Sequence, residues 1–76
     1  MSVKRSITIR GHRTSFSLED EFWAELKALA ATQGVSLSQL VAEIDTTRGT
    51  ERNLSSALRL YVFNHLKKLA TENVAT

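Results

Sequence analysis

The absence of cysteine from a chain of only 76 residues is the feature that most constrains its fold. Without cysteine there is no disulfide framework, no thiolate zinc site and no cysteine nucleophile, so packing alone must hold the structure together. A chain this short buries only about 60% of the surface that its unfolded form exposes, which leaves a small core. We therefore expect one domain over residues 1–70, a frayed tail at 71–76, and an oligomer that enlarges the core.

The apolar segments of the chain are too short to cross a membrane. The N-terminus also lacks an apolar stretch followed by a small-residue cleavage site, so no signal peptide is expected. Together with the lack of cysteine, these features predict a soluble protein of the reducing cytoplasm.

Positive charge is concentrated at the start of the chain. Four basic side chains and no acid lie in the first thirteen residues, whereas the remainder carries six basic and eight acidic side chains. A basic segment on a slightly acidic body is typical of proteins that bind a polyanion. A solvated arm that only aids solubility would explain the same composition.

The first eighteen residues alternate polar and apolar side chains with the period of a β-strand. Ile7 and Ile9 have odd numbers, whereas Phe16 and Leu18 have even numbers. One straight strand would therefore send the two apolar sets to opposite faces. The alternation must change phase between them.

Gly11-His12 can supply that change of phase in two ways. It is either a β-bulge in one strand or the two-residue turn of a β-hairpin over residues 5–18. In the hairpin, Arg10 would face Arg13 and every apolar side chain would share one face, at the cost of opposing two like charges. The hairpin is slightly favoured over a bulged strand or a mobile arm.

Three helices are predicted after this segment, which makes the chain mainly α-helical with a short N-terminal β segment. The first begins at the capping-box pattern Ser17-Leu18-Glu19-Asp20 and ends at Gly34, and the second begins at a second capping box, Ser36-Leu37-Ser38-Gln39. A polar loop at 46–52 precedes the third helix, which Asn53 or Ser55 can cap. The predicted helices span about 18–32, 36–46 and 54–70.

The third predicted helix has an unusually wide apolar face. One stripe accounts for most of it: Leu54, Leu58, Tyr61, Val62, Leu66 and Leu69. Leu60 and Phe63 lie outside that stripe and would be exposed on a monomer, so a second surface must cover them. We therefore expect a homodimer with a core shared between its chains. The residues expected in that core are Phe16, Leu18, Phe22, Leu26, Leu37, Leu40, Val41, Ile44, Leu60 and Phe63.

The predicted order of strand, helix, glycine turn and helix resembles the ribbon-helix-helix superfamily of Arc- and methionine-repressor-like proteins. Residues 13–46 carry this resemblance, with Arg13-Thr14-Ser15-Phe16-Ser17-Leu18 before the first helix and Gly34-Val35-Ser36-Leu37-Ser38-Gln39-Leu40 before the second. Three further stretches resemble a bacterial subfamily that adds a third helix: Gly11-His12-Arg13-Thr14-Ser15, Phe22-Trp23 and Asn53-Leu54-Ser55-Ser56-Ala57-Leu58-Arg59.

The resemblance implies a homodimer whose strands pair into a ribbon that enters the DNA major groove. Alternate side chains of the ribbon would contact base edges, and here these are Arg13, Ser15 and Ser17. Arginine can bind guanine through two hydrogen bonds, whereas serine donates to or accepts from any base. Modest base specificity is therefore expected.

Phosphate contacts are expected from two places. The first is the N-terminus of the second helix, where the amides of Ser36, Leu37 and Ser38 can hold a phosphate. A plain capping role would also account for Ser36. The second place is the basic start of the chain, which would add contacts independent of base sequence: Lys4, Arg5 and Arg10.

A hairpin would complicate this mode of binding. If residues 5–10 fold back as a strand, the dimer would present four strands, whereas the major groove admits a two-stranded ribbon. Either this segment leaves the sheet as an arm when DNA binds, or the polar face meets another partner.

The sequence offers no site for catalysis, a metal or a cofactor. His12 and His65 lie in different predicted elements, without a carboxylate or cysteine at ligand spacing. Ser15 and Ser17 lack the base and oriented acid that a serine nucleophile needs. We expect no enzymatic activity.

The leading hypothesis is a bacterial homodimer that binds double-stranded DNA and represses transcription by occupying an operator. The alternative is a protein-interaction module, an adaptor or antitoxin, that holds a protein partner without DNA. Antitoxins of this superfamily usually append a disordered tail that binds the toxin. Here an ordered amphipathic helix is predicted after the ribbon-helix-helix segment, which favours the regulator.

Overall fold

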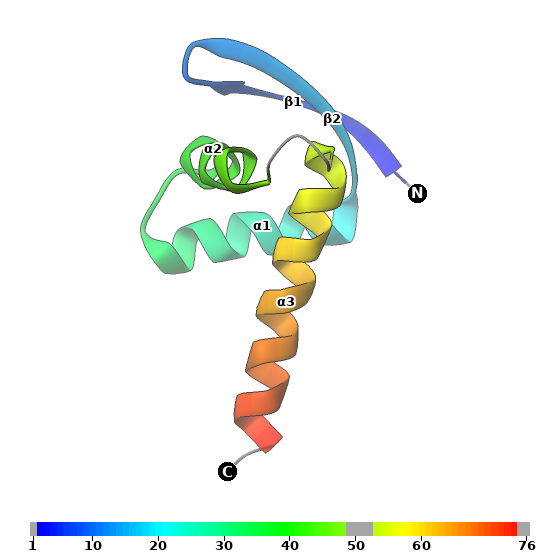
Figure 1. Cartoon of the computed structure of the whole chain (residues 1–76), viewed down its shortest axis with the longest axis vertical. Helices are drawn as coiled ribbons and strands as arrows, with labels where there is room; N and C mark the ends of the chain where they lie inside the picture. Colours follow the sequence, from blue (N-terminus) through cyan, green and yellow to red (C-terminus); the bar gives the residue numbers. More distant parts are fainter. Residues whose placement is uncertain (1, 49–52, 75–76) are drawn as a thin grey trace.

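The computed structural model describes residues 2–48 and 53–74, which form two strands and three helices (Figure 1). The hairpin lies across one end of the helical body, and the second half of α3 projects away from the other elements. The predicted fold class, mainly helical with an N-terminal β segment, is confirmed. The elements are β1 (Ser2–Ile9), β2 (His12–Glu19), α1 (Asp20–Gln33), α2 (Leu37–Thr47) and α3 (Leu54–Val74).

Antiparallel pairing of β1 with β2 confirms the hairpin over the bulged strand and the mobile arm. The turn is Arg10-Gly11 and not Gly11-His12, so the cross-strand partner of Ile9 is His12. Both turn residues have positive φ, 51° for Arg10 and 80° for Gly11. Two positive φ values define the type I′ turn, whose twist matches that of the flanking strands, and glycine takes one of the positions at little cost.

The strands pair two residues away from the predicted register, but every side chain lies on the face predicted for it. The partner of Ile9 moves from Thr14 to His12, and such a shift preserves faces because strand side chains alternate with period two. The expected opposition of Arg10 and Arg13 does not occur, since Arg13 faces Thr8. The apolar side chains of both strands therefore share one face, turned toward the helices.

The predicted capping box at the start of the first helix is wrong. β2 continues through Glu19, which is paired with Ser2, and α1 begins at Asp20. Glu19 occupies the N-cap position without a side-chain capping hydrogen bond. Ser17 cannot cap the helix because it is paired with Lys4 in the hairpin, two residues before the N-cap position. The predicted end of the helix is confirmed at Gly34, which has φ 72°.

The other helix starts match their predicted caps. The amide of Gln39 donates to Ser36 Oγ at 3.0 Å, and the amide of Ser56 donates to Asn53 Oδ1 at 2.8 Å. α3 continues to Val74 instead of ending near residue 70, so much of the tail expected to fray is helical. Positions 49–52 of the predicted loop and the last two residues lie outside the described residues.

The core lies between the hairpin and the three helices of one chain. Six side chains are almost completely buried: Leu18, Leu26, Leu40, Val41, Leu58 and Val62. Six of the residues expected in a shared dimer core are buried within this single chain: Phe16, Leu18, Leu26, Leu40, Val41 and Ile44. β1 and α3 of the same chain contribute to this cluster. That these residues also belong to a core shared with a second chain stays a prediction. Phe22 and Leu37 are partly buried against the same cluster.

An ion pair joins the end of β2 to α3. Arg59 donates two hydrogen bonds to the Glu19 carboxylate, from Nε to Oε1 at 2.8 Å and from Nη2 to Oε2 at 3.1 Å. These hydrogen bonds to Arg59 lower the pKa of the Glu19 carboxyl below its ordinary value of 4.5. The pair fixes the junction between hairpin and helices to the first half of α3.

Glu19→Gln is expected to lower the melting temperature at pH 7 by weakening this junction. Because folding lowers the pKa of Glu19, the stabilisation is complete above about pH 4.5 and is lost as the pH falls through the lowered pKa. The difference from wild type should therefore shrink between pH 5 and about pH 3. Thermal melts across this range, with Glu21→Gln in the first turn of α1 as the control, test it. If Glu19→Gln lowered the melting temperature by the same amount at every pH, the ionised Glu19 carboxylate would not be the stabilising group.

Candidate nucleic-acid interface

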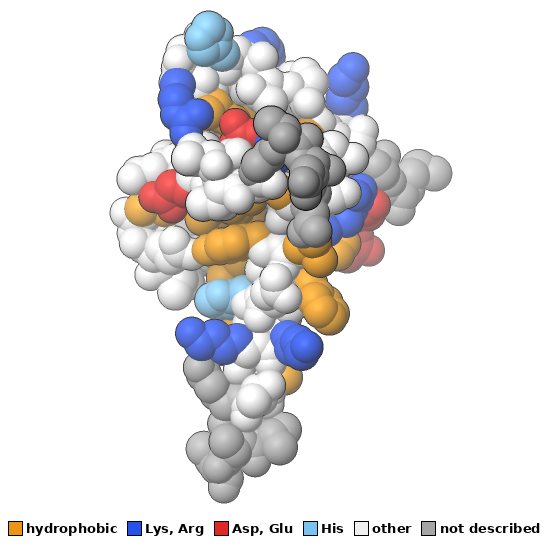
Figure 2. All heavy atoms as spheres, in the orientation of Figure 1, with side chains coloured by type: hydrophobic (Ala, Val, Ile, Leu, Met, Phe, Trp, Pro, Cys, Tyr) orange, Lys and Arg blue, Asp and Glu red, His pale blue; other side chains and the backbone are white. Residues whose placement is uncertain are grey.

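The outward face of the hairpin presents the three residues expected to contact bases. Arg13, Ser15 and Ser17 alternate along β2 and are all exposed, while Phe16 and Leu18 between them are buried. Figure 2 shows Lys and Arg side chains along the hairpin end of the molecule. The period of the strand thus brings the predicted residues together on one accessible surface.

β1 contributes as many residues to this outward face as β2. Lys4 lies opposite Ser17, Ser6 opposite Ser15, and Thr8 opposite Arg13, and all six are exposed. The hydroxyls of Ser6 and Ser15 are hydrogen-bonded at 3.2 Å. The sequence analysis placed the apolar side chains of the hairpin on one face and assigned no contact to Ser6 or Thr8 on the other. The alternation of β1 already contained the signal that could have identified them.

Arg5 lies on the opposite, inward face of the hairpin. The expectation that its side chain is accessible to a phosphate is therefore wrong. Its cross-strand partner is Phe16, and its guanidinium carbon lies 4.7 Å from the centre of the Trp23 ring. Arg5 also forms an ion pair with Asp20 and has a side chain only 16% exposed. Odd-numbered residues of β1 face the helices, so Arg5 attaches the hairpin to α1 by a cation–π contact and an ion pair.

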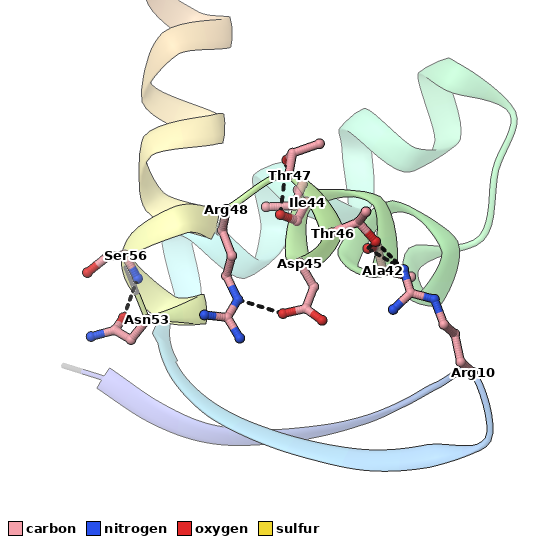
Figure 3. Close-up of polar contacts among 9 residues, drawn as sticks. All are labelled: Arg10, Ala42, Ile44, Asp45, Thr46, Thr47, Arg48, Asn53 and Ser56. Carbon is pink, nitrogen blue, oxygen red and sulfur yellow. Dashed lines mark hydrogen bonds and ion pairs between the residues drawn. The ribbon is translucent and has the colours of Figure 1, made fainter. Parts of the chain in front are cut away.

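Arg10 is also engaged with the helical body (Figure 3). From the turn, its Nη2 donates to the carbonyl oxygen of Ala42 at 3.3 Å and to the hydroxyl of Thr46. These contacts hold the turn end of the hairpin against α2. Of the three basic residues expected to contact phosphates, Lys4 alone lies on the outward face.

The N-terminus of α2 has the geometry of a capped helix. Ser36 takes an extended conformation before the first turn, with φ −72° and ψ 157°, and its side chain accepts the hydrogen bond from Gln39. Leu37 packs against the core, which fixes the orientation of this first turn. The capping role of Ser36 is confirmed, and a phosphate on the amides of Leu37 and Ser38 stays a prediction.

A second surface lies along α3. Leu60 and Phe63 are exposed, as expected for one chain, and Phe63 is 55% exposed. Leu66 and Leu69 were expected to be buried in the main stripe but are also exposed, because α3 projects beyond α1 at this point (Figure 1). Figure 2 shows hydrophobic side chains along this flank.

A shallow groove between α2 and α3 adjoins these exposed side chains. It consists of two neighbouring hollows of about 230 and 210 Å³ that share Ile44, Thr47 and Tyr61 in their walls. Leu60 lines one of them. The Tyr61 hydroxyl accepts a hydrogen bond of 2.7 Å from Gln33, which ties α3 to the end of α1.

Other kinds of site are not seen in the part of the chain that the structure describes. No group of three or more His, Cys, Asp or Glu side chains within 2–48 and 53–74 is arranged to hold a metal ion. Among the described helices, none has the length and apolarity required to cross a membrane.

Comparison with known proteins identifies one family. A family model described as a ribbon-helix-helix domain matches residues 2–66, from β1 into the second half of α3. Proteins of this family generally bind DNA as dimers and act as transcription regulators or antitoxins. The same comparisons find no matching curated protein and no matching solved structure.

Ser36→Ala is expected to lower the free energy of unfolding by about 1 kcal/mol, because it removes the oxygen that caps the Gln39 amide. Ser38→Ala is the matched control, since it makes the same change inside the first turn of α2. Urea denaturation of both variants measures the difference. Equal losses of stability would contradict a specific cap at Ser36.

Proposed function

Because the chain belongs to the ribbon-helix-helix family, we propose that it is a homodimeric DNA-binding protein that regulates transcription, as a repressor that occupies an operator. The observation that carries the proposal is the outward face of the hairpin, which is exposed, polar and positively charged. The setting would be the cytoplasm of a bacterium, where this face would enter the major groove of double-stranded DNA. No catalytic role is proposed.

Base contacts would come from β2. Arg13 is the one side chain on this strand that can bind guanine O6 and N7 together, a contact worth about 1–3 kcal/mol of discrimination. Ser15 and Ser17 are short, so the backbone can approach the floor of the groove. Their hydroxyls can donate a hydrogen bond to, or accept one from, the edge of any base. The expected result is specificity concentrated at one position of each half-site.

Phosphate contacts would flank the ribbon. Lys4 is exposed on the outward face and would neutralise a phosphate. The amides of Leu37 and Ser38 at the start of α2 would hold another, since helix N-termini attract anions. Arg5 and Arg10 are left out of this set because their guanidinium groups bind Asp20 and α2.

The homodimer would form through α3. The hairpin and the first half of α3 complete the core of one chain, but Leu60, Phe63, Leu66 and Leu69 stay exposed. Contiguous exposed apolar residues on a small protein mark an interaction surface. A second copy of the same helix would cover them.

The same apolar surface supports a second candidate function. A protein partner could occupy it together with the groove between α2 and α3, as in an adaptor or antitoxin. In that case, substitutions on the outward face of the hairpin would leave function unchanged, and the DNA assays below separate the two candidates.

The chain is expected to sediment as a dimer of 8.5 kDa subunits at micromolar concentration. Phe63→Glu should raise the dimer dissociation constant at least tenfold, because it places a charge in the apolar surface of α3. Lys68→Glu, on a polar position of the same helix, is the control. A folded monomer at micromolar wild-type concentration in sedimentation equilibrium would rule out the dimer.

Arg13→Ala should leave the protein folded but reduce discrimination at one base position per half-site by about 1–3 kcal/mol. Lys4→Ala should weaken binding to all duplexes alike and reduce the salt slope by about one unit. Lys67→Ala on α3 is the control for the lost charge. The measurement is binding to a duplex selected for tight binding, to its single-base variants and to random duplex, at several salt concentrations.

If Arg13→Ala and Lys4→Ala both bind every duplex like wild type, the outward face of the hairpin is not a DNA surface. The protein-interaction function would then replace the DNA-binding one.

A further inference from the structure

We propose that α3 joins two copies of the chain in antiparallel orientation, so that their hairpins lie at opposite ends of the pair and hold two separate DNA segments. The second half of one α3 would occupy the groove between α2 and α3 of the other copy. This inference rests on the proposed DNA-binding function and adds to it the way in which two DNA-binding units are joined.

The second half of α3 presents a face that is both apolar and basic. Leu60, Phe63 and Lys67 follow one another at spacings of three and four residues, so they lie on one side of the helix. All three are exposed, as is Leu66 beside them. From Phe63 to Thr71 the sequence contains two lysines and no acid. Figure 2 shows basic side chains next to apolar ones on this part of the molecule.

The groove between α2 and α3 has a complementary composition. Ile44 and Tyr61 contribute to both of its hollows, and Glu43 lines one of them. Glu43 is exposed and forms no ion pair within residues 2–48 and 53–74. Arg48 lines the other hollow and is paired with Asp45. An apolar wall with a carboxylate at its rim fits an apolar helix that carries a lysine.

The positions of these two features along α3 favour antiparallel packing. The groove adjoins residues 57–64, whereas Leu66 and Lys67 lie farther toward the end of the helix. In a parallel pair, each exposed segment would meet the same segment of the other copy and both grooves would stay empty. In an antiparallel pair, the second half of each helix passes over the groove of the other copy. One two-fold contact therefore fills both grooves.

Charge favours the same orientation. In a parallel pair, Lys67 of one copy would lie next to Lys67 of the other, and like charges on facing helices repel. In the antiparallel pair, each Lys67 moves away from its counterpart and toward the groove of the other copy, where Glu43 lies at the rim. A single lysine among the apolar side chains of a helix interface can specify how the helices pair.

The shape of the chain gives this contact its consequence for DNA. The hairpin lies at one end of the long axis, and the second half of α3 projects at the other end (Figure 1). Two copies joined by their projecting helices in antiparallel orientation therefore present their hairpins on opposite sides of the pair. Adjacent half-sites of one duplex cannot meet both hairpins, whereas two separate duplex segments can. The pair would bridge DNA.

The α3 contact leaves the hairpin unaltered. Among the described residues, β2 is paired on one edge with β1 and has no strand along its other edge. The ribbon pairing that the family resemblance implies would use that edge and would leave the second half of α3 untouched. Binding of DNA by a hairpin and joining of hairpins through α3 are therefore separable by mutation.

The first test reverses the charges of the proposed contact. Lys67→Glu and Glu43→Lys should each raise the dissociation constant between copies about threefold to tenfold, and the double variant should return to within threefold of wild type. Lys68→Glu, about 100° around the helix from Lys67, is the matched control and should have no effect. Sedimentation equilibrium measures the dissociation constants, with folding confirmed by circular dichroism.

Two results of this test would overturn the antiparallel contact. One is a double variant that associates no better than the weaker single variant, because Lys67 and Glu43 then do not meet. The other is a folded wild-type monomer at micromolar concentration, because the exposed face of α3 would then be left for a partner other than a second copy.

The second test measures bridging directly. Wild-type protein is mixed with a duplex fixed to beads and a fluorescent copy of the same duplex, selected for tight binding, and the fluorescence on the beads is recorded. Wild type should capture the fluorescent duplex. Phe63→Glu and Lys67→Glu should lose most of this capture, at least fivefold, while binding a single duplex within threefold of wild type. Lys68→Glu is again the control.

The outcomes distinguish this inference from the proposed function. If wild type binds a single duplex but captures no second one, or if Phe63→Glu captures it as well as wild type does, bridging through α3 is wrong and DNA binding stands. If wild type binds no duplex at all, the proposed function fails and bridging fails with it, while the charge-reversal test still decides the antiparallel contact.

Discussion

Burial of the hairpin's inward face against the helices is the constraint from which the rest of the structure follows. Leu18 and Phe16 of β2 and Ile9 of β1 enter the core. Because strand side chains alternate, burying these residues turns the neighbouring polar ones outward on both strands. The Glu19–Arg59 ion pair at one end and Arg10 at the other hold the hairpin in this position. One packing event therefore creates both the core and the proposed DNA surface.

The basic residues of the N-terminal segment divide into two groups by position in the hairpin. Lys4 and Arg13 face outward, whereas Arg5 faces inward against Trp23 and Arg10 turns toward α2. The charge concentrated at the start of the chain thus serves two purposes. Part of it fastens the hairpin to the helices, and part of it remains available to a polyanion.

α3 links the two surfaces of the molecule. Its first half completes the core through Leu54, Leu58 and Val62, while its second half projects beyond α1 and leaves Phe63 and its apolar neighbours exposed. The hairpin and the C-terminal part of α3 lie at opposite ends of the long axis (Figure 1). Under the proposed function, DNA would bind at the hairpin end and a second copy would bind at the other end.

Features governed by local geometry could be predicted from the sequence: the helices from their periodicity, the caps at Ser36 and Asn53, the glycine end of α1, and the polar face containing Arg13. The tertiary structure decided the turn at Arg10-Gly11, the inward position of Arg5, and the burial of Phe16 and Leu18 within one chain. The physical reason for this division is that helical periodicity and helix caps depend on residues close in sequence. Burial of a side chain depends on residues that are distant in sequence. Arg10 reaches Ala42, and Glu19 reaches Arg59, only after the chain has folded.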